Sequence, residues 1–219
     1  MDVCIFKNLH SAKPQQTSLE KIIEMIRTSH KLEEMTLEAR AFFTAGEKEK
    51  GDIIKKTKLP AFAPCAALID GKGRYNLIGL TGLCFIDIDK VDIEQVDAAM
   101  DTLRNDEHVL LAARSISGHG LHILVPYTLS REDPDTSLPA TPAKANQVYG
   151  SVFKSTAAHF RELLQLPIDN AAANAERLCV VSYDGQAHFN PAATPIVYKY
   201  EHQKSGKKPK KFAEYSIPE

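Results

Sequence analysis

Two aspartates stand two residues apart in an otherwise apolar stretch, with Asp87 and Asp89 closing the segment 83–89 (LCFIDID). Side chains alternate across a β-strand, so both carboxylates project from the same face. Carboxylates placed among apolar residues lower stability unless another group compensates their charge. Oxygen ligands on one face suit a hard divalent cation. The pair therefore predicts a site for Mg²⁺ or Mn²⁺; the alternative is a pair of strand-end aspartates that face water.

A glycine turn further along the chain leads into a second apolar strand. Ser117, Gly118 and Gly120 form the turn, and His122 stands among the first residues of the strand. Glycine permits positive φ angles and close approach, so the turn amides can face a phosphate. The alternatives are an ordinary hairpin turn and a core histidine. His119 is expected to be exposed and to point away from His122. Together with the aspartates, the turn predicts a site for a metal and a triphosphate.

The periodicity from residue 83 onward predicts an α+β fold built on a β-α-β-β-α-β unit, as in ferredoxin-like and RNA-recognition-motif-like (RRM-like) domains. In order, the expected elements are strand 83–89, helix 92–104, strand 109–115, strand 121–127, helix 143–166 and strand 178–182. A Pro-rich loop is expected to precede the second helix. In the usual form of this unit the strand order is 4-1-3-2, so the third strand lies between the first and the second, the fourth pairs with the first, and all neighbouring strands are antiparallel.

That strand order brings distant residues to one edge of the sheet. Asp89 ends the first strand, His122 begins the third, and Asp169 lies in the segment that leads into the fourth. We therefore expect the carboxylates of Asp87, Asp89 and Asp169 to lie within reach of one cation. Arg177, just before the last strand, is positioned to bind a phosphate or to form a surface salt bridge.

The first part of the chain predicts an α/β extension to this unit. Its expected elements are strand 3–6, a helix that begins near residue 17, helix 37–49, an extended connection at 59–64 and strand 65–69. We expect one domain over residues 1–198, made of an N-terminal α/β part (1–82) and a catalytic part (83–198). Residues 199–219 are expected to form a basic tail or linker, which suggests a further domain, such as a helicase, beyond it.

The composition limits the class of protein. The 219 residues are 43% hydrophobic and 25% charged, with a formal net charge of −1, which is typical of a globular chain. Nucleic-acid contacts must then come from local basic patches, and the lysines of 48–58 and 199–211 are the candidates, or solvated surface. The four cysteines form no CxxC pair, which argues against structural zinc. The absence of a signal peptide or a long apolar run predicts a cytoplasmic protein without membrane contact.

These motifs resemble those of the archaeo-eukaryotic primase superfamily, which includes primase-polymerases of plasmids and phages. More narrowly, the chain looks like the VirE-type N-terminal domain of mobile-element proteins, over roughly residues 6–191. The residues that carry the resemblance are Asp87-x-Asp89, Ser117-Gly118-x-Gly120-x-His122, Ile168-Asp169, Arg177-Leu178-Cys179, Ser182-Tyr183-Asp184, Leu59-Pro60-Ala61 and Gly82-Leu83.

The resemblance implies a primase-polymerase-like fold and a metal-dependent nucleotidyltransferase that acts in replication of a mobile element. It implies that Asp87, Asp89 and Asp169 bind catalytic Mg²⁺ or Mn²⁺, that His122 and the Ser-Gly turn hold a nucleoside triphosphate, and that Arg177 lies nearby. Single-stranded or primed nucleic acid would be the other substrate. The chain departs from the family pattern at Ser182-Tyr183-Asp184, where a Ser-x-His element is common, and it lacks cysteines for an inserted zinc site.

Two other functions fit parts of the sequence. A catalytically inactive nucleic-acid-binding or docking module would keep the fold, although the presence of all three carboxylates argues against lost chemistry. A rolling-circle-type nuclease would use a His-hydrophobic-His metal motif. His119 and His122 are one residue too far apart for that motif.

Overall fold

The structure is a computed structural model that describes residues 1–130 and 141–199. It is an α+β fold with several sheets, in which all but one of the strand pairings are antiparallel. The helices in these ranges are α1 (Leu19–Thr28), α2 (His30–Thr44), α3 (Lys48–Thr57), α4 (Ile93–Leu103) and α5 (Pro142–Leu164), with 3₁₀ turns η1 (Arg74–Asn76) and η2 (Asn170–Ala173). The strands are β1 (Asp2–Phe6), β2 (Gln15–Ser18), β3 (Ala61–Ala63), β4 (Ala66–Leu68), β5 (Leu77–Leu80), β6 (Leu83–Asp89), β7 (Leu111–Arg114), β8 (Gly120–Ser130), β9 (Cys179–Val180), β10 (His188–Phe189) and β11 (Ile196–Lys199).

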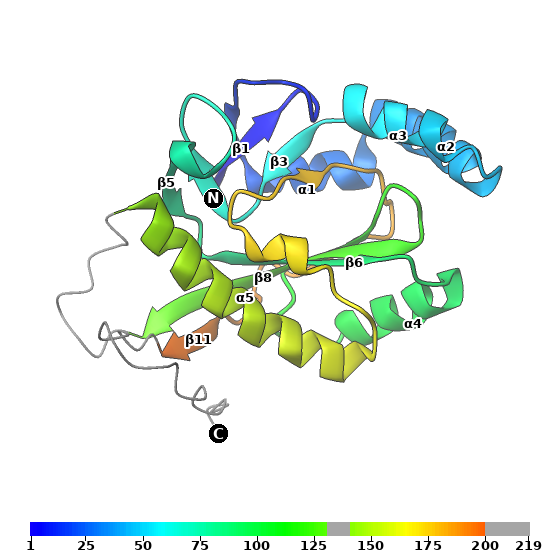
Figure 1. Ribbon diagram of the computed structural model, residues 1–219. Coiled ribbons are helices and arrows are strands. Elements are labelled where there is room, and N and C mark those ends of the chain that lie inside the picture. The colour runs from blue at the N-terminus through cyan, green and yellow to red at the C-terminus, as the bar shows by residue number, and fades with distance from the viewer. Residues whose placement is uncertain (131–140, 200–219) are drawn as a thin grey trace.

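The central sheet is built around the long strand β8 (Figure 1). Strands β6 and β7 pair antiparallel with the same part of β8, one on each side, and β10 pairs with β7. The last strand, β11, runs parallel to the end of β8. The register places Asp87 opposite His122 and Asp89 opposite Gly120. The predicted adjacency of the first three strands of the unit, with the third in the middle, is therefore confirmed.

The fourth strand of the predicted unit lies in a different sheet. Strand β9 pairs with β3, in a sheet of order β2-β1-β3-β9, and not with β6. The expected pairing of strand 178–182 with strand 83–89 is therefore wrong. The expected extended connection 59–64 is the reason, because its central residues form β3 and give β9 a partner, with Ala61 opposite Val180.

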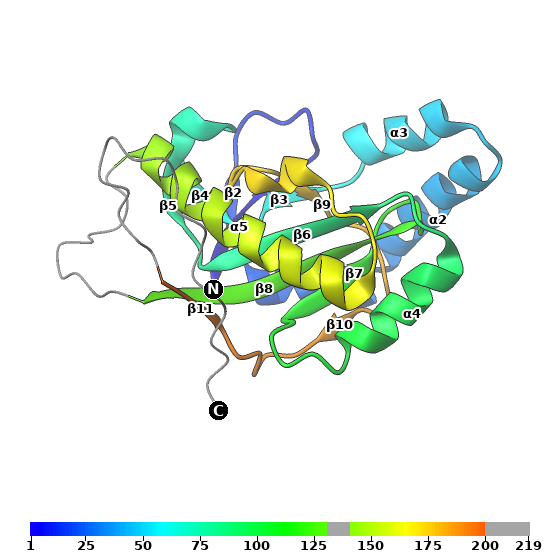
Figure 2. The same ribbon diagram turned by 60° about the horizontal axis from the view of Figure 1, so that its bottom comes forward.

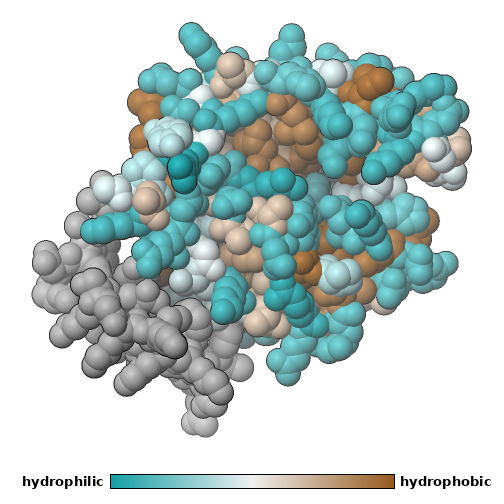
Figure 3. All heavy atoms as spheres, in the orientation of Figure 1, coloured by the Kyte–Doolittle hydropathy of each residue, from teal (hydrophilic) through white to brown (hydrophobic). Residues whose placement is uncertain are grey.

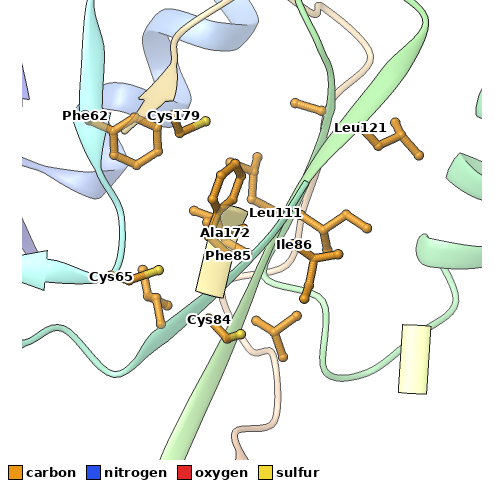
Figure 4. Close-up of a cluster of buried hydrophobic side chains, with 14 of the residues drawn as sticks. Phe62, Cys65, Cys84, Phe85, Ile86, Leu111, Leu121, Ala172 and Cys179 are labelled. Atoms are coloured by element: carbon orange, nitrogen blue, oxygen red, sulfur yellow. The ribbon is translucent and has the colours of Figure 1, made fainter. Parts of the chain in front are cut away.

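The two sheets and the helices form layers (Figure 2). Helices α4 and α5 cover one face of the central sheet, and Tyr149 of α5 reaches the backbone of β6, where Phe85 N donates to its hydroxyl (3.3 Å). The opposite face of the central sheet faces β3 and β9. Figure 4 shows the buried side chains between them, with Phe62 and Cys179 on one side and Phe85 on the other. Because side chains alternate along β6, Asp87 lies on the same face as Phe85.

Local sequence signals fix the helix ends. Ser18 accepts a hydrogen bond from Lys21 N at the start of α1, and Asp92 with Gln95 forms a capping box at the start of α4. The expected helix 37–49 is in fact parts of two helices, α2 and α3. Gly46, at φ +77°, lies in the break between them.

The molecular surface carries both hydrophobic and hydrophilic side chains. Figure 3 shows hydrophobic areas framed by hydrophilic residues on the face seen in Figure 1. None of the helices in the described ranges is long and apolar enough to span a bilayer. The expected Pro-rich loop falls almost wholly on residues 131–140, which lie outside the described residues. The expected basic tail 199–219 also lies outside them, except for Lys199, which is the last residue of β11.

Candidate metal and phosphate site

Three carboxylates meet at one end of the central sheet. Asp87, Asp89 and Asp169 each offer an oxygen, and these oxygens lie within 4.8 Å of one another. Asp87 is 6% exposed, Asp89 is exposed, and Asp169 is half-buried. Of the residues that the structure describes, these three form the one such group of potential metal ligands. Sequence reasoning placed these residues together, and the structure does the same.

The contact that brings Asp169 to the pair differs from the predicted one. Instead of a paired fourth strand, the segment before η2 touches the free edge of β6, where Asp169 N donates to the carbonyl of Asp87 (2.8 Å). Asp169 also caps η2, because its Oδ1 accepts from Ala171 N (2.9 Å). Its other oxygen, Oδ2, lies 3.5 Å from Arg177 Nη2. A single backbone hydrogen bond thus takes the place of the predicted strand pairing and brings Asp169 to the other two aspartates.

Asp87 is the carboxylate that most needs a further partner. Its Oδ1 is buried and accepts no hydrogen bond from the described residues. Burial raises the pKa of Asp87, and the charges of Asp89 and Asp169 add to this shift, while His122 and Arg177 oppose it. A buried acceptor without a donor lowers stability by about 1–3 kcal/mol. A divalent cation bound by the three carboxylates would satisfy this oxygen and neutralise the crowded negative charge, so the donor set fits a hard metal ion.

His122 lies beside Asp87 on the same face of the sheet. Its Nε2 is 3.6 Å from Asp87 Oδ1, and its ring packs edge-on against Phe85 at 5.6 Å between centroids. The side chain is 14% exposed, and burial lowers its pKa, although the nearby charges of Asp87 and Asp89 oppose this shift. Its Nδ1 lies 3.3 Å from Cys179 Sγ. With Nδ1 held by Cys179, Nε2 is the ring nitrogen that faces Asp87.

Cys179 was not assigned a role from the sequence. Burial raises the pKa of its thiol well above the ordinary value, so it remains protonated. A buried, protonated cysteine is a poor nucleophile. We therefore interpret Cys179 as a residue that positions His122. No sequence motif links the two, since they meet only because β9 joins the sheet that faces β8.

One cationic side chain borders the carboxylates, and a second lies near His122. Arg177 is 44% exposed and adjoins Asp169. Lys55 of α3 lies close enough that its charge contributes to the lowered pKa of His122, after the larger effect of burial. The neighbouring Lys50, Lys56 and Lys58 form ion pairs with acidic residues, whereas Lys55 is in none of the ion pairs found among the described residues. The sequence showed the lysine-rich run 48–58 but not which member lies near His122.

The glycine turn lies beside Asp89, but two of its backbone amides already donate hydrogen bonds to neighbouring residues. Gly118 N donates to Ser115 O (3.0 Å), and His119 N donates to the Ser117 hydroxyl (3.2 Å). Gly118 has φ +79°. A Cβ on Gly120 would lie 2.1 Å from Ile88 O, so glycine is required there for strand approach. Phosphate contact from this turn would therefore involve groups other than these two amides.

Arg40 and Asp184, unassigned from the sequence, fix the same turn. Arg40 of α2 donates to Ser115 O (3.1 Å) and Ile116 O (3.3 Å). Asp184 is buried and accepts from Arg114 N (2.8 Å), while Ser182 donates to Arg114 O (3.1 Å). The segment Ser182-Tyr183-Asp184 is therefore occupied in holding the sheet. His119, exposed as expected, faces Val91 O at 3.1 Å through Nδ1.

The comparison with protein families identifies the chain. The model of the family described as BT4734-like, N-terminal domain, matches residues 54–189, which is more than half of the sequence. The match begins inside α3 and ends with β10, so it includes the three aspartates, His122, Cys179 and Arg177, whereas Arg40 lies before it. No curated protein and no solved structure matches the chain significantly.

The chain belongs to the BT4734-like N-terminal domain family. This is a distinct family, so the expected membership in the archaeo-eukaryotic primase superfamily, or in the VirE-type N-terminal family, is wrong. The short motifs that suggested it are each common in α+β proteins. The geometry of the carboxylates, the histidine and the two cations does not depend on that resemblance.

Proposed function

We propose that this domain is a metal-dependent nucleotidyltransferase that uses a nucleoside triphosphate with Mg²⁺ or Mn²⁺. The observation that carries the proposal is the buried Oδ1 of Asp87, which accepts no hydrogen bond from the described residues, next to the carboxylates of Asp89 and Asp169. Such a group, confined to one sheet edge, supports a role as ligand for hard cations. A role in mobile-element replication rested on the family resemblance and is not part of the proposal.

The residues around the carboxylates favour a phosphorylated substrate. A site that only stored a cation would need no positive side chains, yet Arg177 adjoins Asp169 and Lys55 is near enough for its charge to act on His122. Arginine and lysine bind phosphate oxygens, and arginine can do so in bidentate fashion. Nε2 of His122 adds a polar group beside Asp87. Carboxylates for metal and cations for phosphate together suit a metal-bound triphosphate.

Each side chain then has a role that follows from its position. Asp87, Asp89 and Asp169 would hold the metal ions, and Arg177 and Lys55 would neutralise phosphate oxygens. When bound, divalent cations lower the pKa of an attacking hydroxyl and stabilise charge on the leaving phosphates. The attacking hydroxyl would come from the end of a single-stranded or primed nucleic acid, with pyrophosphate as the leaving group.

The test is nucleotide incorporation. We expect the wild-type protein with Mn²⁺ to add labelled nucleotides to primed or unprimed templates, and EDTA to stop the reaction. Asp89→Asn should reduce the rate by about tenfold or more, because it removes one ligand charge without changing side-chain volume appreciably. Asp101→Asn is the matched control, since Asp101 lies on α4 and is 76% exposed.

The outcome also separates the alternatives. A wild-type protein that incorporates nothing, yet binds single strands equally well with and without metal, would contradict the enzyme and favour a docking module. Cleavage of the nucleic-acid strand by a reaction that depends on His119 and His122 would favour a nuclease. Among the described residues, however, neither histidine is part of a group of three potential metal ligands.

A further inference from the structure

The 3₁₀ turn η1, between β4 and β5, presents an aromatic ring to solvent. Tyr75 is 83% exposed, more than any other large hydrophobic residue in the described ranges. Arg74 covers one side of it, with its guanidinium 5.0 Å from the ring centroid and Nη2 donating to the Tyr75 hydroxyl (3.0 Å). The other face of the ring has no ring partner among the described residues. This ring is therefore available for stacking.

The turn stands next to the segment that carries the candidate site. Both η1 and η2 pack against α5. The pKa of Arg74 is raised first by its hydrogen bond to Tyr75 and to a smaller extent by the charge of Glu176, the residue before Arg177. One oxygen of Glu176, Oε2, is buried, so its carboxylate is turned at least partly inward. Tyr75 and Arg74 thus belong to a turn that packs on the same helix as the segment leading to Arg177.

The chemistry of this tip favours a nucleic-acid strand over an apolar partner. An exposed ring beside a guanidinium can bind both parts of a nucleotide, because the ring stacks on a base and the cation meets the adjacent phosphate. Base stacking is tolerant of sequence because every base has a π face.

We propose that Tyr75 stacks on a base of the single-stranded nucleic acid whose end reaches the carboxylate cluster. Arg74 would hold the adjacent phosphate and keep the ring in place. This inference rests on the proposed function, since it names where that reaction's strand substrate binds. The turn η1 would then extend the site along the bound nucleic-acid strand.

Fluorescence anisotropy with labelled oligo(dT) and oligo(U), in EDTA, tests the stacking without any need for catalysis. We expect Tyr75→Ala to weaken binding about tenfold, since one stacked base contributes about 1–3 kcal/mol. Tyr75→Phe should stay within about twofold of wild type, because the ring is kept. Ile93→Ala is the control, since Ile93 is 52% exposed on α4.

Three results would overturn the proposal: equal binding by Tyr75→Ala and wild type, equal losses in Tyr75→Ala and Ile93→Ala, or no binding of either oligonucleotide by wild type. The last result would assign this surface to a protein partner instead. The two proposals fail separately. Tyr75-dependent binding by a protein that never incorporates nucleotides would contradict the enzyme alone, whereas incorporation unaffected by Tyr75→Ala would contradict the stacking alone.

Discussion

Asp87→Asn is expected to abolish nucleotide incorporation while leaving the metal-free protein as stable as wild type, or more stable. The expected loss in rate is about a hundredfold or more, because electrostatic stabilisation is usually the largest single term in catalysis. Stability should not fall, because the substitution removes a buried charge that has no hydrogen-bond donor at Oδ1 and lies near two other carboxylates. Asparagine has nearly the same volume, so packing is retained.

The measurements are incorporation with Mn²⁺ and thermal unfolding in EDTA, both beside Asp101→Asn. Added Mn²⁺ should raise the unfolding temperature of wild type more than that of Asp87→Asn, since a ligand that binds only the folded state stabilises it. A variant that keeps full activity would exclude Asp87 from the chemistry. A variant that loses several degrees in EDTA would show that the carboxylate stabilises the fold and is not under electrostatic strain.

Gly120→Ala is expected to destabilise the protein by roughly 3 kcal/mol or more, which is at the upper end of the usual effect of overpacking. A Cβ at this position would lie 2.1 Å from the carbonyl oxygen of Ile88 and 3.1 Å from the Ser115 hydroxyl. The contact at Ile88 is with backbone, so it can be relieved only by separating β6 from β8. Because Asp89 is opposite Gly120, the same movement would displace the carboxylates.

Gly79→Ala is the matched control. Gly79 is also in a strand, β5, but a Cβ there would meet no atom within 4 Å. We expect its stability to remain within about 0.5 kcal/mol of wild type, as for ordinary surface substitutions. Denaturant unfolding of both variants measures the difference. Equal midpoints for the two would contradict the close approach of β6 and β8 at the site.

The sequence was informative where the structure depends on local patterns. The alternation in 83–89 gave β6 with both aspartates on one face, and helical periodicity gave α4 and α5 to within a few residues. It did not reveal the pairing of the last strand. Strand β9 is only two residues long, and its partner β3 lies between Pro60 and Pro64, which favoured an extended connection. Which strand pairs with which depends on contacts far apart in sequence.

The same distinction applies to the site. Asp87 and Asp89 follow from spacing, and Asp169 from the expected topology, although the actual contact is a single backbone hydrogen bond. Cys179, Lys55 and Arg40 come from β9, α3 and α2, elements whose positions no local pattern predicted. Short motifs also failed to give the family, because an Asp-x-Asp strand and a Ser-Gly turn occur in unrelated proteins.

The most direct test of the metal site is anomalous diffraction from a crystal soaked with Mn²⁺ and a non-hydrolysable nucleoside triphosphate. We expect an anomalous peak bonded to oxygens of Asp87, Asp89 and Asp169 at about 2.0–2.6 Å, with the triphosphate between this peak and Arg177. A peak elsewhere, or none at Mn²⁺ concentrations that saturate the protein in solution, would contradict the site.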